Sequence, residues 1–255
     1  MIQYIKWIGA FFQGNLGYSY RTSEPVLQMI GERIGPTLLL AITATFISIC
    51  VAIPLGIKAA SKPYSVWDYI SSGLSFFMGA TPNFFVGLIF IYVFSVSLGI
   101  LPMGGMYDSS GTRSVGMLLR HLIMPAIVLS FQQIGSWIRY TRSSMLEVLQ
   151  EDYIRTAKAK GLRRRSVIYV HGLRNALIPV VTVIGMSIPT LVGGAVITEE
   201  VFGWPGVGSL MVLSITSRDY PVIMGITVLV AITVLVGNLV TDLVYGLLDP
   251  RISYK

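Results

Sequence analysis

The chain is poor in charged residues and in cysteine. Only 12% of its 255 residues are charged, about half the share of an average soluble domain, and its mean hydropathy is +0.70. So little charge with so much apolar sequence predicts an integral membrane protein. The single cysteine, Cys50, excludes an internal disulfide and a cysteine-based metal cluster.

The sequence also lacks the motifs of most enzymes. It has no GxxxxGK[ST] loop, so we do not expect this chain to bind ATP itself. Its two histidines, His121 and His171, fall on opposite predicted sides of the membrane and cannot share a metal. Glu199 and Glu200 are expected to form a solvated helix end. We therefore predict no catalytic site, no metal site and no cofactor bound by this chain.

Long apolar runs are what the chain has instead. A transmembrane helix needs about 20 mostly apolar residues, and five stretches reach that length. They are 36–57, about 70–98, about 122–140, 177–197 and 222–248. Pro36 is expected in the first turn of its helix, where proline is best tolerated. The pattern predicts an all-α bundle of five transmembrane helices.

The interiors of these spans carry neutral polar residues and no central charge. Proton-driven carriers usually place an ionisable relay near the midplane, so we expect any transport to draw its energy from elsewhere. The polar side chains could line a pathway or simply hydrogen-bond one helix to another. The candidates for pathway lining are Asn83, Gln132, Gln133, Thr233 and Asn238.

The distribution of Lys and Arg predicts the orientation. Segments 1–35, 99–121 and 198–221 hold six of the 19 basic residues, and the other thirteen lie in 58–69, 139–176 and 249–255. Basic residues gather in cytoplasmic loops, which makes 1–35 an extracytoplasmic segment and 249–255 a cytoplasmic tail. Since 1–35 has no recognisable leader, we expect that a preceding span is missing. The alternative is that five spans function without it.

The predicted outer loop, 199–221, combines a turn cluster with a short apolar piece. Its Gly-Trp-Pro-Gly-Val-Gly run precedes 210–215, which is too short to cross a membrane and too apolar for a free loop. We expect a re-entrant element that covers the outer mouth. The residues predicted to form an outer gate, or to contact an external binding protein, are Glu199, Phe202, Trp204, Arg218 and Asp219.

The predicted cytoplasmic loop, 147–175, holds seven of the basic residues. Asp152 is a candidate N-cap for a short helix that stops at Gly161. One face of this helix is apolar, with Tyr153, Ile154, Ala157 and Leu162 at helical spacing. Such a cationic, half-apolar helix could lie on anionic lipid or bind a cytoplasmic partner.

Several motifs resemble those of one membrane protein family. They are EDYIRTAKAKG at 151–161, HGLRNALIPV at 171–180, ITEEVFGWPGVGSL at 197–210, RDYPVIMG at 218–225, LLDPRI at 247–252, GNLGYSY at 14–20 and ERIGPTLLL at 32–40. In this order they resemble permease subunits of ABC importers of the dipeptide/oligopeptide/nickel class. The wider EAA consensus is kept at Ala157 and Gly161, whereas Arg155 replaces its Glu and Thr156 its first Ala.

The resemblance implies a six-span permease domain, here 36–248 without its first span, in the cytoplasmic membrane of a prokaryote. It implies ATP-driven import of short peptides, a second similar permease, two cytoplasmic ATPase subunits that bind ATP and Mg, and an extracytoplasmic substrate-binding protein. Within 151–161 it implies an ATPase-coupling helix, whose contact we expect at Tyr153, Ile154, Ala157 and Gly161. The coupling residues are Glu151, Asp152, Tyr153, Ile154, Arg155, Thr156, Ala157, Lys158, Lys160 and Gly161.

Alternatives remain at this point. Within the class the substrate could be nickel or a glutathione-like compound, because the binding protein sets most of the selectivity. From other classes, an ion-gradient carrier, a channel or a membrane scaffold would also fit a polytopic chain. A nucleic-acid partner is not expected, because the basic residues form no recognisable nucleic-acid module.

Overall fold

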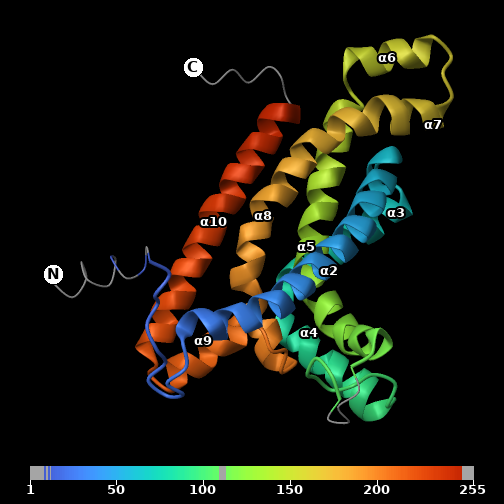
Figure 1. The fold of residues 1–255 in the computed structure, drawn as a ribbon. Coiled ribbons are helices and arrows are strands. Elements are labelled where there is room, and N and C mark those ends of the chain that lie inside the picture. Colours follow the sequence, from blue (N-terminus) through green and yellow to red (C-terminus); the bar gives the residue numbers. More distant parts are fainter. Residues whose placement is uncertain (1–8, 10, 12, 109–112, 249–255) are drawn as a thin grey trace. The chain divides into compact units, whose positions relative to one another are not determined.

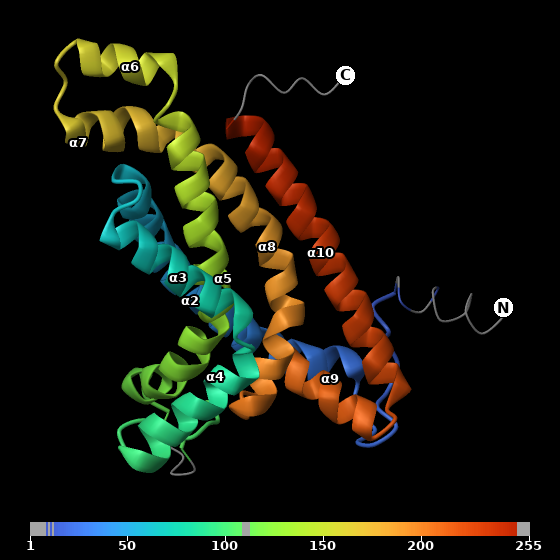
Figure 2. The ribbon, with the colours of Figure 1, turned by 180° about the vertical axis from the view of Figure 1, so that it is seen from behind.

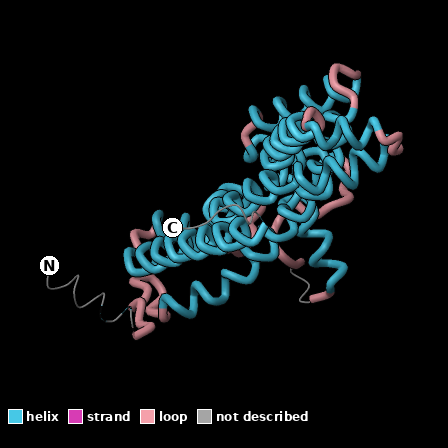
Figure 3. Tube along the Cα trace, turned by 90° about the horizontal axis from the view of Figure 1, so that it is seen from above, coloured by secondary structure: helices cyan, strands magenta, loops and turns pink. Residues whose placement is uncertain are grey.

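The protein is described by a computed structural model that covers residues 9, 11, 13–108 and 113–248, with side chains omitted for 188–194, 242, 244, 245, 247 and 248. The regular elements in this part of the chain are all helices, as Figure 3 shows. Figure 1 labels most of them along the chain. They are α2 (Val26–Ser61), α3 (Val66–Ala80), α4 (Asn83–Phe90), η1 (Ile91–Ser97), α5 (Val115–Val148), α6 (Asp152–Ala159), α7 (Arg164–Ser166), η2 (Val167–Gly172), α8 (Leu173–Val201), α9 (Val207–Thr216) and α10 (Tyr220–Leu248).

Four of the described helical segments are long and apolar enough to cross a membrane, and a broken pair makes up to five. The four lie in α2, in α5, in 164–187 and in α10, and the pair is α3 with the α4–η1 helix. The all-α membrane fold and the five-span prediction are confirmed at this level. Residues 1–12 of the predicted N-terminal segment 1–35 lie almost wholly outside the described residues, and the tail 249–255 lies wholly outside them.

The prediction that Pro36 lies in the first turn of its helix is wrong. Helix α2 begins at Val26, so Pro36 lies in its interior instead of its first turn. The earlier start follows from packing, because Val26 and Ile30 are buried against Val207, Leu210, Val222 and Ile226. Tertiary burial therefore extends the helix beyond the apolar run visible in the sequence.

The predicted second span is interrupted. Helix α3 ends at Ala80, and α4 begins at Asn83. Proline disfavours helical geometry in the residue before it, and Thr81, before Pro82, has extended angles of φ −87° and ψ 125°. Its hydroxyl donates to the Phe77 carbonyl at 2.7 Å, which satisfies one end of the broken helix.

Contacts divide the described residues into two compact units. One takes its residues from 1–42, 84–128 and 190–236, and the other from 43–83, 129–189 and 237–255. The core of the second unit is formed by Ala52, Met78, Ile134, Trp137, Ile138, Val180 and Ile184. Glycines allow close helix packing there, as membrane helices commonly require. A Cβ on Gly135 would lie 2.7 Å from the Ser75 carbonyl oxygen, and one on Gly56 would lie 2.6 Å from Thr141 Cβ.

Candidate functional sites

Helix α6 is an amphipathic helix held against its own chain. It lies beside α7 in both Figure 1 and Figure 2. Ile154 is fully buried and Ala157 is 6% exposed, and both pack with Val167 and Leu149. The apolar face is thus confirmed for these two residues, but it packs against residues of the same chain. Tyr153 and Leu162 are more exposed, at 41% and 42%.

The ends of α6 differ slightly from the predicted ones. The N-cap residue is Glu151, without a side-chain cap bond, and Asp152 is the first helical residue. Asp152 instead receives a hydrogen bond from Arg155 at 3.4 Å, and its charge still suits the positive end of the helix. Gly161 follows the helix with φ +74°, a conformation that favours glycine. The predicted stop at Gly161 is confirmed.

A side-chain hydrogen bond ties α6 to α8. The Asn175 amide donates to the Tyr153 hydroxyl oxygen over 2.8 Å. Together with the buried Ile154 and Ala157, this bond fixes α6 on its inner side. Arg155, Thr156, Lys158 and Lys160 remain exposed. The exposed side of α6 is therefore cationic. Its other side is held by apolar contacts with Leu149 and Val167 and by the hydrogen bond from Asn175.

A second cluster surrounds Glu199 near the end of α8. This carboxylate is fully buried, so the expected solvated helix end is wrong for Glu199. Its Oε1 accepts a hydrogen bond from the Thr37 hydroxyl at 2.7 Å, and its Oε2 accepts one from the Ser209 amide at 3.1 Å. The Thr37 oxygen in turn accepts from the Val207 amide at 2.8 Å.

These bonds cap helix α9 from outside. The first N–H groups of a helix lack intrahelical partners, and the N-cap of α9 is Gly206, which has no side chain to supply one. Glu199 and Thr37 supply the acceptors instead. A Cβ on Gly206 would lie 2.1 Å from a Glu199 oxygen, and one on Gly208 would lie 2.8 Å from the other. The glycines leave room for the carboxylate.

Burial raises the pKa of the Glu199 carboxyl. Hydrogen bonds from Thr37, Ser209 and Gly208 stabilise the charged form and partly oppose this rise. The balance favours a proton on Glu199 at a higher pH than on an ordinary glutamate.

Most of the predicted outer residues are buried in the first unit. Phe202 and Trp204 are 1% and 0% exposed, and the Trp204 indole donates to the Pro36 carbonyl at 2.9 Å. Asp219 is 2% exposed and accepts hydrogen bonds from the Ser19 hydroxyl and the Tyr20 amide. Arg218 is the exposed one of the five. An outer-gate role remains a prediction for all five residues, and direct contact with an external protein remains one for the exposed Arg218.

Comparison with known proteins decides the family. The family model described as "Binding-protein-dependent transport system inner membrane component" matches residues 52–254. The chain belongs to this family of permeases. It is 47% identical to the oligopeptide transport system permease protein AppB of Bacillus subtilis, over 99% of this chain and 80% of that one. It is 40% identical to the dipeptide transport system permease protein DppB of Escherichia coli, over 99% and 81%.

Solved structures agree on the fold. The permease superposes on a chain of the MetNI methionine ABC transporter in an inward-facing conformation with a TM-score of 0.72 and 17% identity, covering 89% of this chain and all of that one. A chain of an amino acid ABC transporter gives a TM-score of 0.63 at 13% identity, with 88% and 94% covered. With the family match and the apolar helices, this fold makes the protein a multi-pass transmembrane permease subunit of the ABC-importer type.

The permease's predicted pathway residues differ in their contacts and exposure. Gln133 accepts a hydrogen bond from the Ser48 hydroxyl at 3.0 Å, which favours a helix-bonding role for it. The Thr233 hydroxyl donates to Leu229 of its own helix. Gln132 and Asn238 are exposed, and the Asn83 Oδ1 atom is buried without a partner among the described residues. Pathway lining stays a prediction for these residues.

Two polar contacts in the permease are not evident from the sequence. Arg142 makes a two-point ion pair with the buried Asp68, at 2.5 and 2.8 Å, which joins α3 to α5. The buried His121 ring lies 3.0 Å from the Gly104 carbonyl and 3.1 Å from Asp108. The partners of these residues lie 74 and 13 to 17 positions away, so no local spacing reveals them.

Proposed function

We propose that this permease forms part of the pathway by which an ATP-driven importer carries short peptides across the cytoplasmic membrane of a prokaryote. The substrate class is supported by the relatives, which carry names of oligopeptide and dipeptide permeases over nearly the whole of this chain. The energy source is external, since the sequence contains no ATP-binding loop. A second permease, two ATPase subunits holding ATP and Mg, and an extracytoplasmic binding protein complete the proposed importer.

Helix α6 is the proposed contact with an ATPase subunit. The observation that carries this role is its two-sided character. Ile154 and Ala157 anchor its inner face, while Arg155, Thr156 and Lys160 remain exposed. A helix that transmits movement must be joined rigidly to the spans that move. The three-residue connection from α5 and the Tyr153–Asn175 hydrogen bond to α8 meet this requirement.

Enlarging the anchor of α6 tests the coupling role. Ala157→Leu would force extra volume against Val167 and Leu149, and overpacking of this kind costs about 1–3 kcal/mol. We expect uptake per ATP hydrolysed to fall several-fold while the importer still assembles. The control is Ala159→Leu, on the exposed side of the same helix. Normal coupling in Ala157→Leu at normal expression would contradict the role of α6.

Uptake by cells tests the substrate. A strain that lacks this permease should lose growth on di- and oligopeptides that supply a required amino acid, and the intact gene should restore it. Nickel accumulation and glutathione uptake are measured in the same strain. If the strain still grew on peptides but no longer accumulated nickel, the substrate would be nickel instead of peptide. The assignment to the ABC-importer class would not change.

A further inference from the structure

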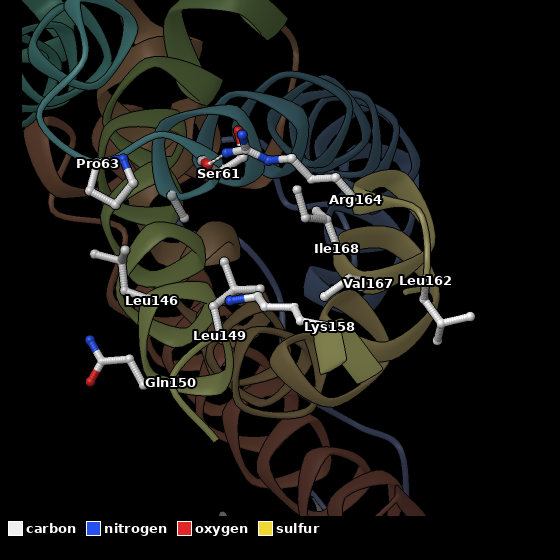
Figure 4. Close-up of a pocket in the computed structure, with 11 residues that line it drawn as sticks. Ser61, Pro63, Leu146, Leu149, Gln150, Lys158, Leu162, Arg164, Val167 and Ile168 are labelled. Atoms are coloured by element: carbon white, nitrogen blue, oxygen red, sulfur yellow. Dashed lines mark hydrogen bonds between the residues drawn. The ribbon is translucent and has the colours of Figure 1, made fainter. Parts of the chain in front are cut away.

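A pocket behind the coupling helix has the chemistry of a ligand site. Its volume is about 460 Å³, which is within the usual range of small-molecule sites. Figure 4 shows the side chains around it. They come from the end of α2, the end of α5, and the segment from α6 to η2: Ala60, Ser61, Pro63, Leu146, Leu149, Gln150, Lys158, Leu162, Arg164, Val167 and Ile168.

The pocket is apolar inside and cationic at its edge. Leu146, Leu149 and Ile168 provide much of the apolar lining. In Figure 4 the side chains of Arg164 and Lys158 extend across it on opposite sides, with Arg164 reaching toward Ser61 and Lys158 toward Leu149. The eleven described lining residues include no carboxylate that could neutralise these two charges.

The basic groups retain free hydrogen-bonding capacity. Arg164 donates one bond, from Nη2 to the Ser61 carbonyl, whereas a guanidinium carries five N–H groups. No ion pair of Lys158 or Arg164 occurs among the described residues. An anion placed between them would meet two cations, and an attached apolar chain would meet the leucines.

The position of the pocket favours a ligand from the membrane. Ala60 and Ser61 end α2, and Leu146 lies in the last turn of α5, so the pocket sits at the same end of two candidate spans. The boundary between acyl chains and headgroups lies at such ends, and anionic headgroups attract basic residues there. The family assignment does not require any ligand at this place.

We propose that this pocket binds an anionic amphipath, a phosphate or carboxylate on an apolar chain, between the coupling helix and the ends of α2 and α5. An anionic phospholipid and a free amphipathic anion from the cytosol share this chemistry. Because α6 contributes to the pocket wall, occupancy stabilises one position of α6. This regulatory consequence rests on the proposed function, whereas binding itself does not.

Photo-crosslinking tests the binding directly. The full chain is labelled in membranes with three photoactivatable probes: a phosphatidylglycerol, a phosphatidylcholine and a fatty acid. The modified residues are then located by peptide mass spectrometry. We expect the anionic probes to label the pocket residues well above the phosphatidylcholine. Labelling by phosphatidylglycerol identifies a lipid ligand, and labelling by the fatty acid alone identifies a free amphipath.

Charge-matched variants separate a site from general attraction. K158Q/R164Q removes both cations of the pocket, and K160Q/R165Q removes two exposed neighbours that do not line it. Each basic residue near an anionic surface changes binding by about fivefold, so the first pair should lose about tenfold or more and the second little. Equal labelling by all three probes, or equal loss in both pairs, would overturn the proposal.

Discussion

At the scale of single residues, Glu199 shows how a buried carboxylate can serve as a remote helix cap. Its two oxygens accept bonds from Thr37 and from the first turn of α9. The arrangement places an acid where the unpaired N–H groups and the dipole of α9 both favour negative charge. Desolvation nevertheless raises the pKa of Glu199. The hydrogen bonds of Glu199 therefore stabilise the folded protein, whereas the removal of its negative charge from water destabilises it.

This balance predicts a pH dependence of stability. A carboxyl whose pKa is raised on folding contributes stability below its unfolded pKa, and that contribution is lost as the pH rises through the folded pKa. Thermal unfolding in detergent should therefore show a loss of stability as the pH rises above the ordinary value of 4.5. Glu199→Gln should flatten this dependence. Glu200→Gln, at the exposed neighbour, should leave it unchanged, and identical profiles for all three proteins would refute the assignment.

Gly206 provides a steric test of the same cap. Its Cβ position lies 2.1 Å from a Glu199 oxygen, so Gly206→Ala must displace the carboxylate or the start of α9. We expect a loss of at least about 1 kcal/mol, the lower end of the cost of overpacking. Gly31→Ala is the control, because it lies in α2 of the same unit with nothing within 4 Å of its Cβ position. The midpoint of denaturant or thermal unfolding measures both. Equal midpoints would mean that Glu199 is not held against Gly206.

At the scale of elements, α6 was predictable as a helix, and its orientation was not. Local signals placed it correctly: acidic residues at its start, apolar residues at helical spacing, and Gly161 at its end. The sequence alone cannot tell whether an apolar face contacts a partner or the chain itself. Val167 and Leu149 decide this, since they cover Ile154 and Ala157. The burial of these two residues leaves the exposed cationic face of α6 as the surface that we propose for the ATPase contact.

The link between α6 and α8 gives a test at this scale. Tyr153→Phe removes the acceptor hydroxyl of the bond from Asn175, and Asn175→Ala removes the donor. An exposed hydrogen bond contributes about 1 kcal/mol, enough to loosen α6 without unfolding the protein. Each variant should lower uptake per ATP hydrolysed by a similar factor, and the double variant should lower it no further. If the loss of coupling in the double variant equalled the product of the two single losses, the two side chains would act separately.

At the scale of the whole molecule, the number and type of spans followed from composition, whereas their ends and breaks depended on contacts. Apolar length alone identified every span, because a bilayer-sized run is a strong signal. It missed the first ten residues of α2, where Val26 and Ile30 are buried by α9 and α10. It also missed the burial of Glu199, since a sequence shows a charge and not the amides around it. The sequence likewise did not reveal that four of the five predicted outer residues, Glu199, Phe202, Trp204 and Asp219, are buried.

The orientation of the molecule remains a prediction, and single cysteines test it. In a Cys50→Ala background, Thr156→Cys places a thiol on exposed α6, and Ser217→Cys places one beside Arg218, also exposed. The excess of Lys and Arg around α6 assigns that side to the cytoplasm. A membrane-impermeant maleimide should therefore label position 217 in intact cells and position 156 only in inside-out vesicles. Labelling of position 156 from outside would reverse the topology, and it would remove α6 from the reach of any cytoplasmic ATPase.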